Sequence, residues 1–252
     1  MKLRLQASVA LAVLCAAFAT QAQERLPVRF DNWLYFQRNT DDSERWQYRP
    51  RVYAPFSLGS GWTFTQRADF PIYYTNRAGP ENSDGGWKAG IGDWFVEETL
   101  GTPELAKNTK ASVGVRFVFP TGGLSPFGSG QYQWAPTVSM SYAMPDAGLT
   151  LSPIARYFMS YHASEDAAAK VRRLDLYPTV TQRIAQGWSV SFYNENAISY
   201  NDITNKWFVP IDAMLIRRAS KDLEYGLGAA YGIKKDDPQY KSMVYGRLTL
   251  YF

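Results

Sequence analysis

The stretch MVYGRLTLYF, Met243–Phe252, alternates between apolar and polar side chains along its whole length. In an extended strand one side would carry Val244, Gly246, Leu248, Leu250 and Phe252, and the other Met243, Tyr245, Arg247, Thr249 and Tyr251. A period of two predicts a β-strand with one apolar face and one polar face. The question is which of the two faces points away from solvent.

The same period recurs through the chain in about a dozen segments of roughly 10 to 14 residues, the length of a tilted strand that crosses a membrane. The predicted strands cover 28–37, 45–58, 61–75, 87–100, 108–119, 131–143, 148–161, 171–184, 187–200, 206–217, 222–233 and 240–252. In 109–119, 171–183 and 207–215 one face is apolar and the other carries charge. This pattern is typical of a membrane barrel, whose apolar side faces lipid and whose polar side faces the lumen.

A soluble β-sandwich would show the same alternation, so the connections between the segments are needed to distinguish it from a membrane barrel. Asn39–Ser43 and Asn76–Gly86 are polar or long, whereas Leu58–Gly61 and Ala185-Gln186 are tight. Long loops at one end and short turns at the other are a property of outer-membrane barrels. The predicted fold is therefore all-β, a transmembrane antiparallel up-and-down β-barrel of about 12 strands.

Interruptions are expected within this barrel. The prolines Pro50, Pro136, Pro178 and Pro210 fall inside predicted strands, where each removes a ladder hydrogen bond. The alternation also loses its phase near Asp93 and near Asn194, which predicts β-bulges there.

The N-terminus has the pattern of a secretory signal peptide. Lys2 and Arg4 precede an apolar run from Ala7 to Ala19, and small residues lead to a predicted cleavage after Ala22. The alternative, an anchor helix, would need about 20 apolar residues. The domain prediction is a signal peptide at 1–22 and an outer-membrane β-barrel at 23–252, in a Gram-negative cell.

Composition narrows the function classes. Without Lys2 and Arg4, 25 basic residues oppose 23 acidic ones, a formal charge of +2 that argues against a nucleic-acid binder. Aromatic residues make up 15% of the chain, mean hydropathy is −0.32, and no segment after the leader approaches 18 consecutive apolar residues, which excludes a helical membrane protein. With one histidine, and with Cys15 inside the leader, we expect no metal site, no disulfide and no cofactor.

On the predicted phase, arginine dominates the side that faces the lumen. The inward charged residues are Arg49, Arg51, Arg67, Asp69, Arg116, Arg156, Arg173, Asp175, Arg183, Glu195, Asp212, Glu224 and Arg247. A guanidinium group can hold a carboxylate or phosphate by two-point contact, so this lumen favours small anions or polar molecules with an acidic group. The alternative is that these charges pair across a narrow interior and plug it.

One stretch carries a family resemblance: FPTGGLSPFGSGQYQWAPTVSMSY, Phe119–Tyr142. Together with GIGD at Gly90–Asp93, it resembles the outer-membrane family labelled as a component of the meta-pathway of phenol degradation, over about two thirds of the chain. The resemblance implies an outer-membrane barrel associated with uptake of small, often aromatic compounds. Gly122, Gly123, Gly128 and Gly130 permit a tightly folded loop that we expect to constrict the pore.

An enzymatic barrel is the competing class. His162 and Ser164 form a His-x-Ser pair similar to that of outer-membrane phospholipase A and the lipid A deacylases, in which serine is the nucleophile and histidine the base. The sequence departs from that pattern at Glu165-Asp166, where those families continue with asparagine. No Asn or Gln lies between Ala163 and Thr181 to orient the imidazole. The pair therefore remains only an alternative to a non-enzymatic barrel.

These observations predict a channel or facilitator in the cell outer membrane, acting by passive diffusion. The expected partners are outer-membrane lipid, a small-molecule solute and the barrel assembly machinery, with no nucleic acid. We include the assembly machinery because an apolar alternation that ends in Phe252 resembles the signal by which this machinery recognises its client proteins.

Overall fold

The structure is a computed structural model that describes residues 26–252, and the predicted signal peptide lies outside that range. No helix among these residues is long and apolar enough to cross a membrane. The fifteen strands are β1 (Arg29–Arg38), β2 (Glu44–Gly59), β3 (Trp62–Asp69), β4 (Ile72–Thr75), β5 (Lys88–Ile91), β6 (Trp94–Gly101), β7 (Thr109–Phe119), β8 (Gln131–Met144), β9 (Leu149–Ala163), β10 (Arg172–Ala185), β11 (Trp188–Phe192), β12 (Ile198–Asn201), β13 (Lys206–Arg218), β14 (Leu223–Lys235) and β15 (Ser242–Tyr251).

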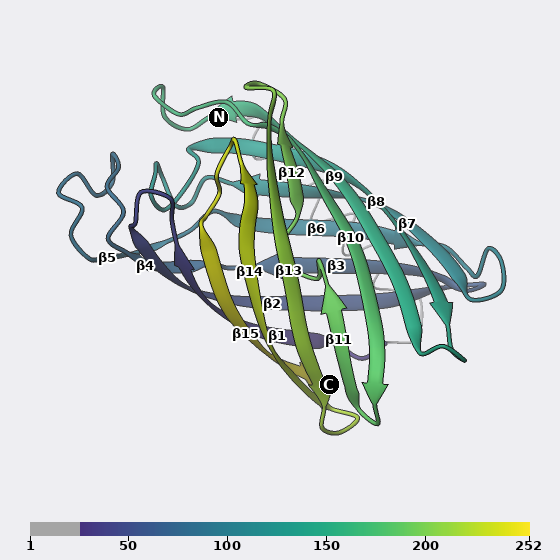
Figure 1. Cartoon of the computed structure of the whole chain (residues 1–252). Helices are drawn as coiled ribbons and strands as arrows, with labels where there is room; N and C mark the ends of the chain where they lie inside the picture. The colour runs from purple at the N-terminus through teal and green to yellow at the C-terminus, as the bar shows by residue number, and fades with distance from the viewer. Residues whose placement is uncertain (1–25) are drawn as a thin grey trace.

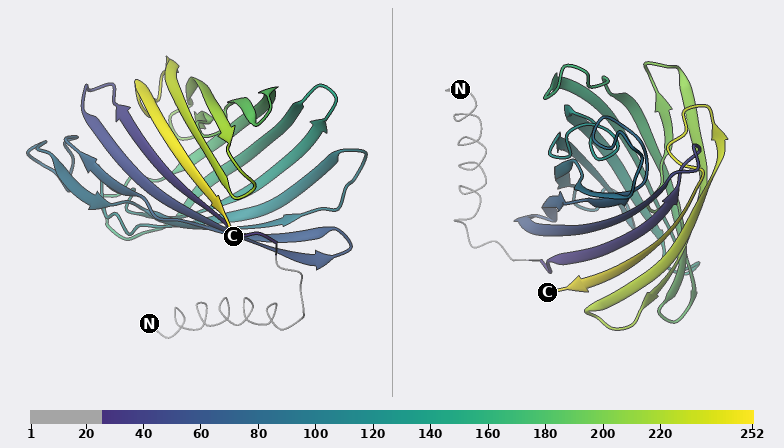
Figure 2. Two further views of the ribbon diagram at one scale, coloured as in Figure 1. Left: turned by 90° about the horizontal axis from the view of Figure 1, so that it is seen from below. Right: turned by 90° about the vertical axis from the view of Figure 1, so that its left-hand side faces the viewer.

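The strands close into an antiparallel up-and-down barrel (Figure 1). Strand β1 pairs with β15 on one side and with β2 on the other, so the first and last strands complete the ring. We call each segment that crosses the barrel wall from one end to the other a stave. Three staves are interrupted and consist of two strands each, namely β3 with β4, β5 with β6, and β11 with β12. The fifteen strands therefore form twelve staves around the barrel. The prediction of about 12 strands is confirmed, and the views in Figure 2 show the staves inclined to the barrel axis.

Two of the three interruptions lie where the sequence predicts β-bulges, but in the structure the strand ends and a new one begins at these places. The break between β5 and β6 falls at Gly92-Asp93, and the break between β11 and β12 spans 193–197. The third, at Phe70-Pro71, was not predicted, although Pro71 lacks the N–H that the ladder needs there. Pro210 lies at a register shift between β13 and β14, as expected of a proline inside a strand.

The faces of the strands follow the predicted alternation. In β15, Val244 and Leu248 are exposed on the outer surface, whereas Tyr245 and Arg247 are buried inside. In β13, Ile211 and Leu215 point outward opposite the buried Asp212. An apolar exterior around a polar interior is stable only in a hydrocarbon environment, so this face contacts lipid. Phe252 is 74% exposed at the end of β15; its recognition by the assembly machinery stays a prediction.

The two ends of the barrel differ in their connections. Loops 76–87 and 120–130 lie at one end, and the two-residue turns Ser60-Gly61 and Gln186-Gly187 lie at the other. The backbones of Val28 and Phe252 pair at the end with the short turns, through N···O contacts of 3.0 and 2.9 Å. In outer-membrane barrels the long loops are extracellular, so the short turns are periplasmic.

Two apolar clusters fill parts of the interior, and their residues lie mainly toward the extracellular half. The first contains Trp33, Tyr35, Phe208, Met214, Ala230, Tyr240 and Tyr245, and the second contains Phe95, Val118, Ala135 and Phe158. Gly228 makes room for the Tyr245 ring, because a Cβ on Gly228 would come within 2.3 Å of it. The arginine side chains occupy the space that these clusters leave.

Candidate functional site

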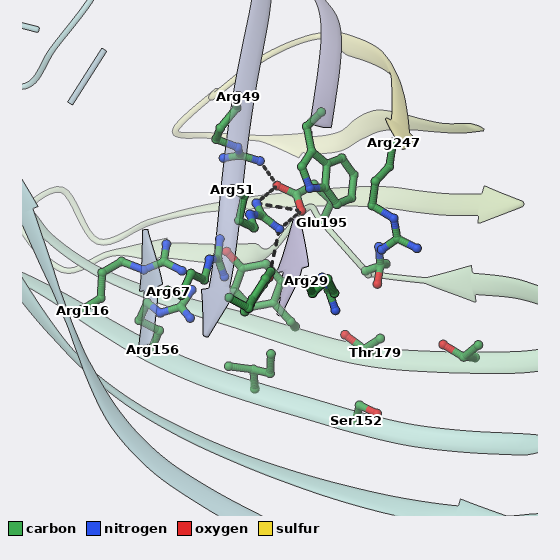
Figure 3. A pocket seen from close by; sticks show the side chains of 16 residues that line it. Arg29, Arg49, Arg51, Arg67, Arg116, Ser152, Arg156, Thr179, Glu195 and Arg247 are labelled. Carbon is green, nitrogen blue, oxygen red and sulfur yellow. Dashed lines mark hydrogen bonds and ion pairs between the residues drawn. The ribbon is translucent and has the colours of Figure 1, made fainter. Parts of the chain in front are cut away.

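A cavity of about 320 Å³ lies inside the barrel. Residues of β1, β2, β3, β7 and β15 border it, together with residues of β9 and β10 and of the segment between β11 and β12. Seven arginines contribute to its wall: Arg29, Arg49, Arg51, Arg67, Arg116, Arg156 and Arg247. Glu195 is the one acidic side chain in the wall among the described residues. Figure 3 shows Glu195 between Arg49 and Arg51, with Arg67, Arg116 and Arg156 grouped beside them.

Asp69 and Glu195 organise the first group of arginines. Arg51 Nε donates to Asp69 at 2.7 Å, and Arg67 Nε donates to the other oxygen of the same carboxylate at 2.7 Å. Arg51 also reaches Glu195 at 3.2 Å, and Arg49 donates to Glu195 as well. Three guanidinium groups from the neighbouring strands β2 and β3 therefore share two carboxylates.

Glu97 on β6 organises the second group. Arg116 from β7 and Arg156 from β9 both donate to Glu97, the latter at 2.9 Å. Arg156 Nε also donates to the Thr137 hydroxyl at 3.0 Å, which fixes its planar head against β8. Like-charged guanidinium groups held together in this way repel one another, and an added anion would relieve that repulsion.

The third part of the wall lies near the seam where the barrel closes. Arg29 pairs with Asp31 at 2.6 Å, and Arg247 pairs with Glu224. Trp33 lies between Arg51 and Arg247, whose guanidinium carbons are 5.0 and 5.3 Å from its ring. Trp33 Nε1 and Arg247 Nε are both buried without a hydrogen-bond partner among the described residues.

The balance of charge determines what this cavity can bind. Its seven arginines share five carboxylates, Asp31, Asp69, Glu97, Glu195 and Glu224. Two positive charges are therefore left in excess within this set. Such a site favours anions, and most strongly those with the planar geometry of a carboxylate.

Glu195 reaches the cavity because its stave is interrupted. The segment 193–197 leaves the ladder between β11 and β12, and Tyr193 takes a positive φ of 52°. Asp212, fully buried on β13, accepts hydrogen bonds from the backbone N–H of Glu195 at 3.3 Å and of Asn196 at 3.2 Å, and from the Tyr245 hydroxyl. These donors hold the segment in place and leave the Glu195 side chain free to extend into the lumen.

The predicted pore-lining residues divide into two sets. The structure brings Arg49, Arg51, Arg67, Asp69, Arg116, Arg156 and Arg247 together at or directly behind the cavity wall. The other three lie elsewhere. Asp175 is buried with Arg173 and Ser199, Asp212 holds the 193–197 segment, and Arg183 is exposed at the periplasmic end of β10. Arg183 contacts the Pro145 carbonyl at 3.4 Å and does not reach the cavity.

Sequence reasoning missed Arg29, Glu97 and Trp33 as parts of this site. Arg29 shares the inward face of β1 with Asp31 and Trp33, so the alternation of that strand could have found both Arg29 and Trp33. Glu97 follows the break at Gly92-Asp93, where the alternation of inward and outward side chains shifts by one residue. Its inward orientation could be predicted only once that slip was located.

The glycine-rich loop packs over the extracellular end of the barrel. Gly123 and Gly130 have positive φ values of 65° and 64°, as a tightly folded loop requires. Asp93 anchors the loop by accepting from the Ser129 N–H at 2.7 Å and the Gly122 N–H at 3.2 Å. No residue of this loop lines the arginine cavity. A constriction by Gly122, Gly123, Gly128 and Gly130 thus stays a prediction for the extracellular entrance.

The alternative catalytic pair lies at the extracellular end of β9. His162 is exposed, with its ring 5.6 Å from that of Tyr132. The Ser164 hydroxyl donates to the Gly130 carbonyl at 3.0 Å. Its proton is thus directed to the neighbouring loop, whereas a nucleophilic serine would direct it to the imidazole.

No protein-family model and no curated protein matches the chain. Among solved structures, the COG4313 outer membrane channel from Pseudomonas putida F1 superimposes with a TM-score of 0.69 at 10% identity, covering 92% of this chain and 98% of that one. The NanC porin gives a TM-score of 0.54 at 14% identity, covering 89% and 99%. Outer membrane phospholipase A from Escherichia coli gives 0.52 at 9% identity, covering 92% of each chain.

At such low identities the likeness concerns the fold. All three structures are outer-membrane proteins, and the barrel described here has the same closed β architecture with an apolar outer face. The chain is an outer-membrane β-barrel by fold and by location. The set includes a phospholipase as well as a channel and a porin, so this fold occurs with more than one activity.

Proposed function

We propose that the protein is a channel for passive uptake of small solutes that carry an acidic group. The observation that carries this proposal is the cavity inside the barrel, where seven arginines share five carboxylates. A fixed positive potential in a narrow, low-dielectric lumen raises the local concentration of anions and lowers their barrier to passage. Solute movement follows the concentration gradient and needs no cofactor.

The finer part of the proposal concerns the solute. The resemblance of Phe119–Tyr142 to the phenol meta-pathway family suggests small aromatic compounds, and the likeness to an outer membrane channel supports passage through the lumen. Aromatic rings also border the cavity, from Trp33, Tyr53 and Tyr177. An aromatic acid would satisfy both the rings and the guanidinium groups.

Two competing functions lead to different expectations. A lipid hydrolase would need His162 to activate Ser164, but the Ser164 proton is directed to the Gly130 carbonyl. A plugged structural barrel would use the same ion pairs to close the lumen, and it would pass no current even when those pairs are removed.

Planar-bilayer recordings across a salt gradient test the channel directly. We expect the wild-type protein to conduct with preference for anions. Arg116→Ala and Arg247→Ala should each reduce the ratio of anion to cation permeability about two- to fivefold, because each removes one buried charge from the cavity wall.

Arg183→Ala is the matched control, since Arg183 is exposed at the periplasmic end and does not border the cavity. It should leave the permeability ratio unchanged. Cation preference in the wild type would contradict the arginine argument. Absence of current in the wild type and in both cavity variants would favour the plugged barrel.

A further inference from the structure

We propose that Glu195 is a tethered occupant of a carboxylate-binding site formed by Arg49 and Arg51, and that an aromatic monocarboxylate displaces it during passage. This inference rests on the proposed function and names the ligand class and the place where it binds. It also assigns a role to the 193–197 interruption, because the irregular backbone of this segment carries Glu195 into the lumen.

The contacts of Glu195 are those that a bound carboxylate would make. Arg49 donates to its Oε1, Arg51 reaches both of its oxygens at 3.2 and 3.4 Å, and the Tyr35 hydroxyl donates to Oε1 at 2.9 Å. Two guanidinium groups and a phenol thus converge on one carboxylate; Figure 3 shows the two arginines at Glu195. A guanidinium pair in this arrangement matches a planar carboxylate better than a spherical or tetrahedral anion.

The backbone that carries Glu195 is separate from the wall that carries the arginines. Arg49 and Arg51 lie on β2, whereas Glu195 comes from the other side of the barrel, between β11 and β12. Among the described residues, Glu195 makes one hydrogen bond to its own side of the barrel, from its backbone N–H to Asp212 at 3.3 Å. Exchange of the Glu195 carboxylate for that of a ligand therefore breaks contacts across the lumen and leaves the ladder intact.

The surroundings of this site select an aromatic acid. Trp33 lies beside Arg51 and is 1% exposed, and its Nε1 has no hydrogen-bond partner among the described residues. Arg247 Nε, on a side chain that is 8% exposed in the same wall, is likewise without one. These buried donors point to a second acceptor in the cavity, and the rings of Tyr53 and Tyr177, which are only partly buried, offer apolar surface to the body of the ligand.

Displacement replaces one carboxylate by another at Arg49 and Arg51, and the two positive charges in excess within the cavity compensate the displaced Glu195 carboxylate, which stays in the lumen. An intramolecular competitor lowers the apparent affinity for free ligand by the fraction of molecules in which the site is open. The tether therefore gives weak binding and fast release, which a channel needs and which a high-affinity binding site would prevent.

Isothermal titration of the detergent-solubilised full-length protein tests the inference. Benzoate should bind the Glu195→Gln variant at least about tenfold more tightly than the wild type, as expected when an occupant of about nine in ten sites is removed. Acetate should bind the variant more weakly than benzoate does, because it lacks the ring, and inorganic phosphate should bind it more weakly than benzoate because it lacks the planar carboxylate geometry.

Glu224→Gln is the matched control. It removes the same charge from another arginine of the cavity, Arg247, but Glu224 is held in β14 and does not border the cavity. Its benzoate affinity should stay within about twofold of the wild type. An equal gain in both variants would show a general charge effect and overturn the tethered occupant. Phosphate binding tighter than benzoate in Glu195→Gln would overturn the ligand class.

Failure of this inference is distinguishable from failure of the proposed function. A protein that conducts anions while Glu195→Gln gains no affinity for benzoate would remain a channel without a tethered occupant. A protein that conducts nothing would fail as a channel regardless of the titration.

Discussion

Two of the three interrupted staves are stabilised in the same way, by a carboxylate that accepts backbone hydrogen bonds, but they present different side chains. At the β5/β6 break, Asp93 accepts hydrogen bonds from Gly122 and Ser129 and so pins the glycine-rich loop at the extracellular entrance. At the β11/β12 break, Asp212 accepts hydrogen bonds from Glu195 and Asn196 and so pins the segment 193–197 inside the lumen. In both places a carboxylate accepts hydrogen bonds from backbone N–H groups that lie outside the strands.

The difference lies in what each pinned segment presents. The loop at the entrance brings small residues and Phe127 against the neighbouring strand, where Gly90 leaves room for the ring. The inner segment brings an acidic side chain to a cluster of arginines. A strand break is thus structural where it faces a loop, and it gains a role in solute binding where it faces the charged lumen.

The largest effect is expected from Asp212→Ala, which removes the acceptor that holds the segment 193–197 at the β11/β12 break. The substitution leaves the buried N–H groups of Glu195 and Asn196 and the Tyr245 hydroxyl without their acceptor. We expect a loss of about 3 kcal/mol in the free energy of unfolding, measured by urea titration in lipid vesicles, because buried donors left unpaired are costly.

Asp202→Ala is the control for this loss, since Asp202 accepts one hydrogen bond from Tyr157 near the β12–β13 turn. It should change the free energy of unfolding by less than about 1 kcal/mol. Equal losses in the two variants would show that Asp212 does not organise the inner segment.

A smaller effect is expected from Asp93→Ala, which removes the acceptor at the β5/β6 break. The donors of Ser129 and Gly122 lie near the extracellular end, where water can replace the lost acceptor. We expect a loss of about 1 kcal/mol, together with faster hydrogen exchange of the backbone in 120–130.

The affinity of Asp93→Ala for benzoate should equal that of the wild type, because no residue of the loop borders the cavity. A changed affinity would mean that the entrance and the cavity are coupled, and the contrast between the two breaks would then fail.

The strands of this fold could be predicted from the sequence to within about two residues at most ends, because the lipid face and the lumen face impose a strict period of two. The phase slip near Asp93 and the loss of alternation near Asn194 also located two of the three interruptions. The break at Phe70-Pro71 could not be predicted from the alternation, because the side chains on either side of it keep the same period, with Asp69 inside and Ile72 outside.

The site was less accessible to sequence reasoning. Alternation places Arg49, Arg51 and Arg247 on the inward face, but it does not give their depth along the barrel or their partners on distant strands. Arg183 illustrates the limit: it has the correct parity in β10, yet it lies at the periplasmic end of the strand. The approach of Glu195 to Arg49 depends on the shape of an irregular segment, and no periodic pattern encodes that shape.

The central claim is that Arg49 and Arg51 form a carboxylate site that Glu195 occupies. A crystal structure of Glu195→Gln soaked with 4-iodobenzoate tests it most directly, because the anomalous signal of iodine locates the ring. The account predicts iodine inside the cavity and the ligand carboxylate between Arg49 and Arg51. Iodine found only on the lipid-facing surface, with the arginines still bound to residue 195, would contradict it.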